Sequence, residues 1–354
     1  MSGATLSNPR RVGTGFEFSI VGASNAIYAI EASSDLHDWT LVATNRQLGE
    51  VRTILMPASA QEEFYRVRLL QPLFTGALGV RESLEAAGSG LRVDSFDSRD
   101  PNYSRPDGSY DPAKARDHGD IITHSALTNA LSLGNSKVYG VLHVPPGGSA
   151  ALGPGGLVGS FLWALNGQLG IEPGHLMERT NRVFVDAELP GGVYVTPGPG
   201  SIDGTNYTYV LSNGYYALPD LILGSTRMML ITGHATLYVS RSFHVTGTIV
   251  IRPEASLDLY VGAPDAAFLL SRVMNESRNA AAFAYYGLPG NVNITVGFGS
   301  FAGTIYAPAA DVYFGGGGND EMDFTGAAVS RNITVNGKMN VHYDERLGIA
   351  GPAL

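Results

Sequence analysis

The chain alternates short apolar runs with turn-forming residues over most of its length. Near its start, runs such as Phe16–Val21, Ala26–Ser33 and Arg52–Met56 place apolar and polar side chains in alternation. A period of two is typical of strands that bury one face. Five such runs at this spacing predict a small antiparallel β-sandwich over residues 1–72. Its expected large core side chains are Tyr28, Trp39 and Tyr65.

A second pattern, an apolar residue, any residue and a glycine followed by a short apolar run, occurs four times. Its glycines are Gly140, Gly247, Gly303 and Gly326, and the last two lie 23 residues apart. That spacing suits one coil of a right-handed parallel β-helix, whose strands rise ~3.3 Å per residue. We therefore predict a β-solenoid domain over residues 91–350.

The segment between these two domains has few strand signals. We predict that residues 73–90 form a linker, with a short helix at Arg81–Ala87, and that the stacked strands begin at Ile121. Residues 181–216, rich in Pro-Gly pairs, are expected to cover one side of the stack.

Composition supports an all-β chain and excludes several partners. With 45 Gly and only 16% charged residues, the chain has many tight turns and few charged helix faces. The net charge of -9 argues against a nucleic-acid partner, because phosphate binding needs clustered positive charge. There is no Cys, so disulfides and thiolate metal sites are excluded. No apolar run reaches the ~20 residues of a membrane span.

Two acidic stretches are candidates for Ca²⁺, a hard cation that takes six or more oxygen ligands. The first contains Asp97 and Asp100, and the second contains Asp320, Glu321 and Asp323. Neither matches the EF-hand spacing. Turn capping by the Asp side chains, or a solvated loop that protects a strand edge, explains the same residues. Both interpretations stay open, and no other cofactor is predicted.

His342 lies close to two carboxylates, Asp344 and Glu345. On a strand, His342 and Asp344 share a face, which allows either acid-base chemistry or hydrogen bonds that close the last coil. A second, weaker candidate for a metal combines His118 and His124 with nearby acidic residues, Asp117 and Asp120.

Motifs of known enzyme classes are missing from the sequence. Pectin-type lyases and polygalacturonases are the enzymes most natural to a parallel β-helix, but the chain has no Arg-x-Lys signature. A Gly-x-Ser-x-Gly elbow and a His-Glu-x-x-His helix are also missing. No catalytic residue is predicted on this basis.

Parts of the chain resemble known modules. Tyr28–Thr44, closed by Phe64–Val67, resembles the small fibronectin-III-like module of secreted and surface proteins of Verrucomicrobia and related bacteria. Residues 90–348, through motifs such as Asp94–Ser98, Gly303–Pro308 and Val341–Glu345, resemble an uncharacterised bacterial domain of surface and pilus-associated proteins. The resemblance implies a solenoid and export, and it implies no catalytic residues.

The sequence thus predicts a secreted or cell-surface structural or adhesive protein without catalytic activity. Its expected partner is a glycan or another cell-envelope or matrix component, bound by Tyr, Asn, Thr and Gly on an extended face. Met1–Leu6 lacks the features of a signal peptide, so we expect an export leader outside the printed sequence.

Two alternatives remain. The first is a polysaccharide lyase or hydrolase, for which a cleft lined by Asp and Arg would be the discriminating feature. The second is a self-assembling filament subunit, because the repeat resembles the bactofilin type and open solenoid ends expose unpaired strand edges.

Overall fold

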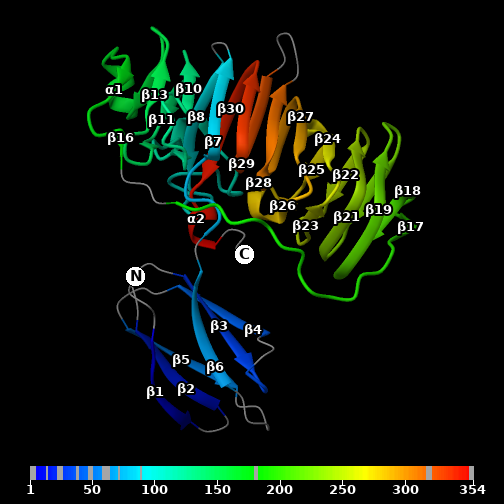
Figure 1. The fold of residues 1–354 in the computed structure, drawn as a ribbon. Helices are drawn as coiled ribbons and strands as arrows, with labels where there is room; N and C mark the ends of the chain where they lie inside the picture. Colours follow the sequence, from blue (N-terminus) through cyan, green and yellow to red (C-terminus); the bar gives the residue numbers. More distant parts are fainter. Residues whose placement is uncertain are drawn as a thin grey trace. The chain divides into compact units, whose positions relative to one another are not determined.

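The protein is all-β and divides into two compact units (Figure 1). The computed structural model describes residues 5–12, 15–21, 27–36, 40–46, 51–57, 64–70, 72–87, 90–178, 182–315 and 321–350. The first unit ends at Pro72, where the predicted first domain ends, and the second begins at Leu73.

The first unit contains two antiparallel sheets of three strands each. One sheet has the order β1 (Thr5–Val12), β2 (Gly15–Val21), β5 (Val51–Pro57), and the other has the order β4 (Thr40–Arg46), β3 (Ile27–Ser33), β6 (Phe64–Leu70). The rings of Phe18 and Tyr65 meet between the sheets at 5.8 Å. Tyr28 is buried, as predicted, while Trp39 lies outside the described residues.

The second unit consists mainly of parallel strands in two sheets. The smaller sheet contains β17 (Gly198–Ile202), β18 (Thr205–Leu211), β20 (Met228–Ile231), β22 (Thr248–Ile251) and β25 (Val273–Asn275), and only β17 runs antiparallel to its neighbour. The larger sheet has 19 strands, which pair in three parallel ladders.

Ladder A runs through β28 (Gly299–Gly315), β29 (Glu321–Asn336), β30 (Lys338–Asp344), β8 (Leu91–Phe96), β11 (Lys137–Tyr139), β14 (Leu157–Gly159) and β15 (Gly170–Ile171). Ladder B runs through β19 (Gly214–Leu223), β21 (His234–Val245), β23 (Ser256–Val261) and β26 (Phe283–Gly287). It continues through β28 and β29, which it shares with ladder A, to β7 (Leu78–Ala87), β9 (Ile121–Thr123), β12 (Leu142–His143) and β16 (Leu176–Met177). Ladder C starts at β21, runs through β24 (Asp265–Leu269) and β27 (Asn293–Gly297), and then passes through the shared strands β28, β29 and β7. It ends with β10 (Leu131–Gly134) and β13 (Ala150–Leu152). The helices are short: α1 (Phe161–Leu165), α2 (Leu347–Ala350), η1 (Pro112–Lys114), η2 (Leu270–Arg272) and η3 (Ala280–Ala282).

The register explains the repeated pattern in the sequence. Gly303 pairs with Gly326, so the 23-residue spacing corresponds to one step between parallel strands. The apolar residue that precedes the glycine by two positions is buried, and it stacks on the residues in register with it on neighbouring strands. One such row, fully packed in the core, consists of Phe301, Phe324, Val341, Val93, Val138 and Val158. Gly247, by contrast, stands at a different corner, between β21 and β22.

The prediction assumed that the strands stack in the order of the chain, and this assumption is wrong. The segment expected to be a linker contains β7, which pairs with β29, and the helix expected at Arg81–Ala87 is part of that strand. β8 likewise pairs with β30. The stack therefore starts before Ile121, and the first strands of the unit lie beside its last strands, cyan beside red in Figure 1.

The chain reaches one end of the stack at β16 and crosses to the other end through a return segment, residues 182–197 (Figure 1). Side chains of the sheet hold this extended segment. Arg81 donates from Nε to the Phe184 carbonyl at 3.0 Å, and the Tyr306 hydroxyl donates to the Val185 carbonyl at 2.7 Å. Tyr194 packs its ring on Tyr215 at 5.5 Å. These contacts agree with the expectation that this region covers one side of the stack.

Gly326 is a position where the close approach of two strands leaves no room for a side chain. Its φ is +145°, and a Cβ there would lie 1.8 Å from the Gly303 carbonyl oxygen of the next strand. Gly337 has a similar φ of +123°, but a Cβ there would meet no atom within 4 Å. We expect Gly326→Ala to lower the free energy of unfolding by about 1–3 kcal/mol more than Gly337→Ala, because only the first overpacks a strand contact. Denaturant titration of both variants measures the difference. Equal losses would mean that backbone conformation alone requires glycine at Gly326.

Candidate functional site

A cleft lies where the parallel pairing of the second unit is interrupted. β25 is the last strand of the five-stranded sheet, and no strand pairing joins it to β28 among the described residues. Instead, the Asn275 side chain bridges the gap, since its Nδ2 donates to the Ala302 carbonyl at 2.9 Å and to the Asn279 carbonyl at 2.7 Å. The break leaves polar side chains of both edges facing solvent.

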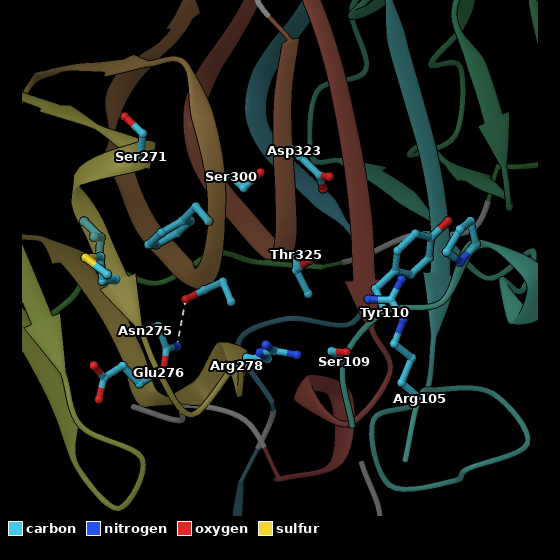
Figure 2. Close-up of a pocket in the computed structure, with 15 residues that line it drawn as sticks. Arg105, Ser109, Tyr110, Ser271, Asn275, Glu276, Arg278, Ser300, Asp323 and Thr325 are labelled. Atoms are coloured by element: carbon cyan, nitrogen blue, oxygen red, sulfur yellow. Dashed lines mark hydrogen bonds between the residues drawn. The ribbon is translucent and has the colours of Figure 1, made fainter. Parts of the chain in front are cut away.

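The cleft has a volume of about 680 Å³, which lies within the ~300–1,000 Å³ typical of ligand sites. One wall is the segment Ser271–Arg278, the floor comes from β28 and β29, and the opposite wall is the loop that follows β8 (Figure 2). Its polar lining residues are Arg105, Ser109, Tyr110, Ser271, Asn275, Glu276, Arg278, Ser300, Asp323 and Thr325.

The loop wall, residues 97–118, is held by its own turns. Asp97 binds Arg99 through both carboxylate oxygens, at 2.9 and 2.7 Å. The Asp100 carboxylate accepts from the backbone N–H of Asn102 at 2.9 Å. Lys114 donates from Nζ to two loop carbonyls, each at 2.7 Å. The loop is therefore a structured wall with its acidic side chains engaged inside it.

Tyr110 fastens this loop to the sheet through a buried polar cluster. The Tyr110 ring stacks on the His342 ring with a centroid distance of 3.6 Å, and its hydroxyl donates to Asp94 Oδ2 at 2.9 Å. Asp94 is fully buried, and its other oxygen lies 2.6 Å from His342 Nδ1. On the opposite side of the ring, His342 Nε2 lies 3.3 Å from Asp323 Oδ1. The cluster thus connects the buried side of the loop to a carboxylate in the cleft.

The surroundings of His342 favour its protonated form. Burial by itself lowers the pKa of His342, but the hydrogen bonds to Asp323 and Asp94 outweigh burial, and the net pKa is raised. Burial, together with the Asp94 carboxylate, raises the pKa of Tyr110, so the phenol stays neutral and donates its proton. Arg92 also reaches Asp94, at 3.3 Å. The buried carboxylate therefore has two basic partners and one neutral donor.

The predicted Ca²⁺ residues do not converge. Within the loop, Asp97 binds Arg99, and Asp100 accepts from the Asn102 N–H. Glu321 accepts from Asn340 Nδ2 at 2.7 Å, Asp323 faces the cleft, and Asp320 lies outside the described residues. Within the described ranges, no group of three or more His, Cys, Asp or Glu side chains could hold a metal ion. The calcium prediction stays a prediction.

His342 and Asp344, which were expected to share a strand face, form no hydrogen bond with each other in the described part of the chain. Asp344 accepts instead from the backbone N–H groups of Ser98 and Arg346, at 3.2 and 3.1 Å. β30 also does not close an end of the stack, because it lies between β29 and β8. The actual partner of His342 is its register neighbour Asp94, about 250 positions away in the sequence.

The other histidine pair is also separated. His118 Nδ1 lies 3.0 Å from Glu345, whereas His124 Nδ1 lies 2.8 Å from the Arg182 carbonyl. Asp120 interacts with His143 at 2.9 Å. Each histidine thus has a structural partner of its own.

Sequence reasoning missed Arg105, Tyr110, Arg278 and the role of Asp94. One signal was present: Asp94 follows Val93 and His342 follows Val341 in strand-forming segments, and an ionisable residue that a strand buries needs a partner.

Comparisons with known proteins add a family without an assigned function. A family model described as "Domain of unknown function (DUF7305)" matches residues 191–349. The match includes one wall and the floor of the cleft, but not the loop wall. No curated protein and no solved structure matches the chain. In the described part of the chain, no helix is long and apolar enough to span a membrane.

The His342 cluster predicts a pH-dependent stability. Because the folded pKa of His342 is raised, its contribution is fully present below the unfolded pKa of ~6.5 and is lost as pH rises through the folded value. At pH 6 we expect His342→Gln to lower the free energy of unfolding by about 3–5 kcal/mol, because Asp94 loses a buried partner. The difference in free energy of unfolding between the parent chain and His342→Gln should shrink toward pH 9. Denaturant titrations at several pH values measure it.

The matched control is His244→Gln, at an exposed histidine. We expect a change within about 0.5 kcal/mol at every pH. A His342→Gln penalty that stays constant from pH 6 to pH 9 would contradict the role assigned to the imidazolium.

Proposed function

We propose that this protein is an exported, surface-located carbohydrate-binding protein, and that its second unit is a right-handed parallel β-helix that presents the cleft. Three parallel ladders with strand steps of about one coil support the β-helix. The proposed hand follows from the strong general preference for right-handed parallel crossovers. Export and surface location rest on the resemblance of both units to modules of surface proteins.

The cleft is the observation that carries the binding proposal. It is open, and ten of its fifteen lining residues carry hydroxyl, amide or charged side chains. Sugars present many hydroxyl groups, and binding them requires donors and acceptors that are not already satisfied within the protein. A rigid floor of paired strands and a wall fastened through Tyr110 pre-organise these groups, which lowers the entropy cost of binding.

The cleft replaces the extended aromatic face that the sequence favoured. A row of tyrosines does follow ladder B in register, Tyr238, Tyr260, Tyr286 and Tyr306. Three of them, Tyr260, Tyr286 and Tyr306, are buried, and Tyr306 donates to the return segment. This row therefore offers no open platform for stacking a sugar.

A second candidate function is hydrolysis or elimination of the bound polysaccharide. The observation that favours it is the composition of the cleft, which holds two carboxylates, Glu276 and Asp323, together with Arg105 and Arg278. Carboxylate pairs perform acid-base chemistry on glycosidic bonds. Asp323, however, is already engaged by the His342 imidazole at 3.3 Å. Binding without reaction is the better-supported function.

The test is a panel of neutral and acidic polysaccharides, incubated with the full chain with and without Ca²⁺. We expect retention of the protein on at least one polysaccharide, with no new sugar ends or unsaturated products. Ser300→Trp, which fills the floor of the cleft, should abolish retention by steric exclusion of the ligand. Asn293→Trp, at an exposed position outside the cleft, should leave it unchanged.

New products that disappear in Asp323→Asn would establish the second candidate instead. Retention that survives Ser300→Trp, or no retention on any member of the panel, would refute binding at this cleft.

A further inference from the structure

The charges that line the cleft are paired, with one exception. Arg278 forms an ion pair with Asp107 of the loop wall. Glu276 lies 3.6 Å from Arg252, and Asp323 lies 3.3 Å from His342. Arg105, by contrast, has no side-chain hydrogen bond and no ion pair within the described part of the chain. Hydrogen bonds with Ser109 and, to a smaller extent, the charges of Arg278 and Arg105 lower the pKa of Asp107, but this carboxylate is already ion-paired with Arg278. The cleft therefore contains one guanidinium without an ion-pair partner of its own.

The backbone that carries Arg105 is well defined. Its N–H donates to the Ser109 carbonyl at 2.9 Å, and its carbonyl accepts from the Gly108 N–H at 2.9 Å. Gly108 has φ +78°, a conformation that favours glycine and closes this turn. Tyr110, which contacts Asp94 and His342, comes directly after Ser109, so it anchors this turn to the sheet. Figure 2 places Arg105 beside Tyr110 on the loop wall, across the cleft from Asn275 and Glu276.

Three hydroxyls of the cleft also remain available. The side-chain oxygens of Ser271, Ser300 and Thr325 make no hydrogen bond within the described residues. Ser300 and Thr325 extend from the paired strands β28 and β29, so their positions are set by the sheet register. A ligand that enters the cleft thus meets hydroxyl groups on the floor and a guanidinium on one wall.

We propose that the cleft selects glycans that carry carboxylate groups, uronic acids in particular, and that Arg105 is the residue that recognises the carboxylate. This inference rests on the carbohydrate-binding function proposed above. A guanidinium presents paired N–H donors that match the two oxygens of a carboxylate. The net charge of the whole chain, -9, would repel an acidic polymer, so selectivity must come from this local charge.

The hydroxyls and the guanidinium have separate tasks in this arrangement. Ser271, Ser300 and Thr325 bind sugar hydroxyls, which neutral and acidic glycans share. Arg105 adds a charge-assisted hydrogen bond that only the acidic glycan can accept. Removing Arg105 should therefore reduce the preference for acid without abolishing the binding of sugar.

The experiment compares two probes, an oligogalacturonate and its fully methyl-esterified form, in which methyl esters replace the charged carboxylates; each is titrated calorimetrically into the full chain. We expect the acid to bind about tenfold more tightly than the ester, the effect of one charge-assisted hydrogen bond. Arg105→Gln should remove most of this preference while leaving the affinity for the ester within about twofold. Because the added interaction is electrostatic and solvent-exposed, the preference should shrink as salt rises.

The matched control is Arg227→Gln, at an exposed arginine outside the cleft, which should change neither affinity. The unfolding midpoint of Arg105→Gln should stay close to that of the parent chain, because the Arg105 side chain makes no hydrogen bond or ion pair within the described residues. Equal affinity for acid and ester, or an equal loss of both in Arg105→Gln, would overturn the role of Arg105 but leave carbohydrate binding standing. No binding of either probe, nor of any glycan in the wider panel, would overturn both proposals.

Discussion

The pairing of β29 and β30 with β7 and β8 is the interaction on which the second unit depends. It joins strands near the end of the unit to strands at its beginning, through a register that runs from Ala328 with Leu78 to Asn336 with Ala87. A parallel strand without a neighbour leaves a row of unpaired backbone groups, here in the middle of a stack. The pairing therefore makes two separately connected stacks into one. It also demands contacts across about 250 residues of chain, which makes formation slow relative to local structure.

The cleft is a consequence of the same pairing. The loop wall follows β8, so it reaches the cleft only because β8 lies beside β30. That neighbourhood brings Tyr110 over His342 and sets Asp94 in register with His342. The opposite wall arises from a different cause, since the five-stranded sheet ends at β25 without pairing to β28. The pairing of β30 with β8 and the missing pairing of β25 with β28 in the described part of the chain together produce a polar cleft with a floor of paired strands.

The charges of the cleft illustrate how structure assigns roles to acidic residues. Asp323, Asp97 and Asp100 read alike in the sequence, as carboxylates in turn-rich segments. In the fold, Asp97 neutralises Arg99 within the loop, Asp100 caps a turn, and Asp323 meets an imidazole at the edge of a ligand-sized space. Among the described charges of the cleft, Arg105 alone makes no hydrogen bond or ion pair through its side chain, and the proposed preference for anionic sugars rests on this.

The sequence by itself determined the all-β class, five of the six strands of the first unit and the register of Gly303 with Gly326, because alternation and glycine spacing are local properties of a strand. It missed β1 (Thr5–Val12). It could not give the order of the strands. β7 reads as a linker or a helix until β29 lies beside it, since Leu78, Val80 and Leu84 are buried by residues far away in the sequence. His342 was correctly singled out, but neighbours in the sequence supplied the wrong partner. Only the tertiary structure decided that partner, because a buried carboxylate and imidazole meet wherever the sheet register places them.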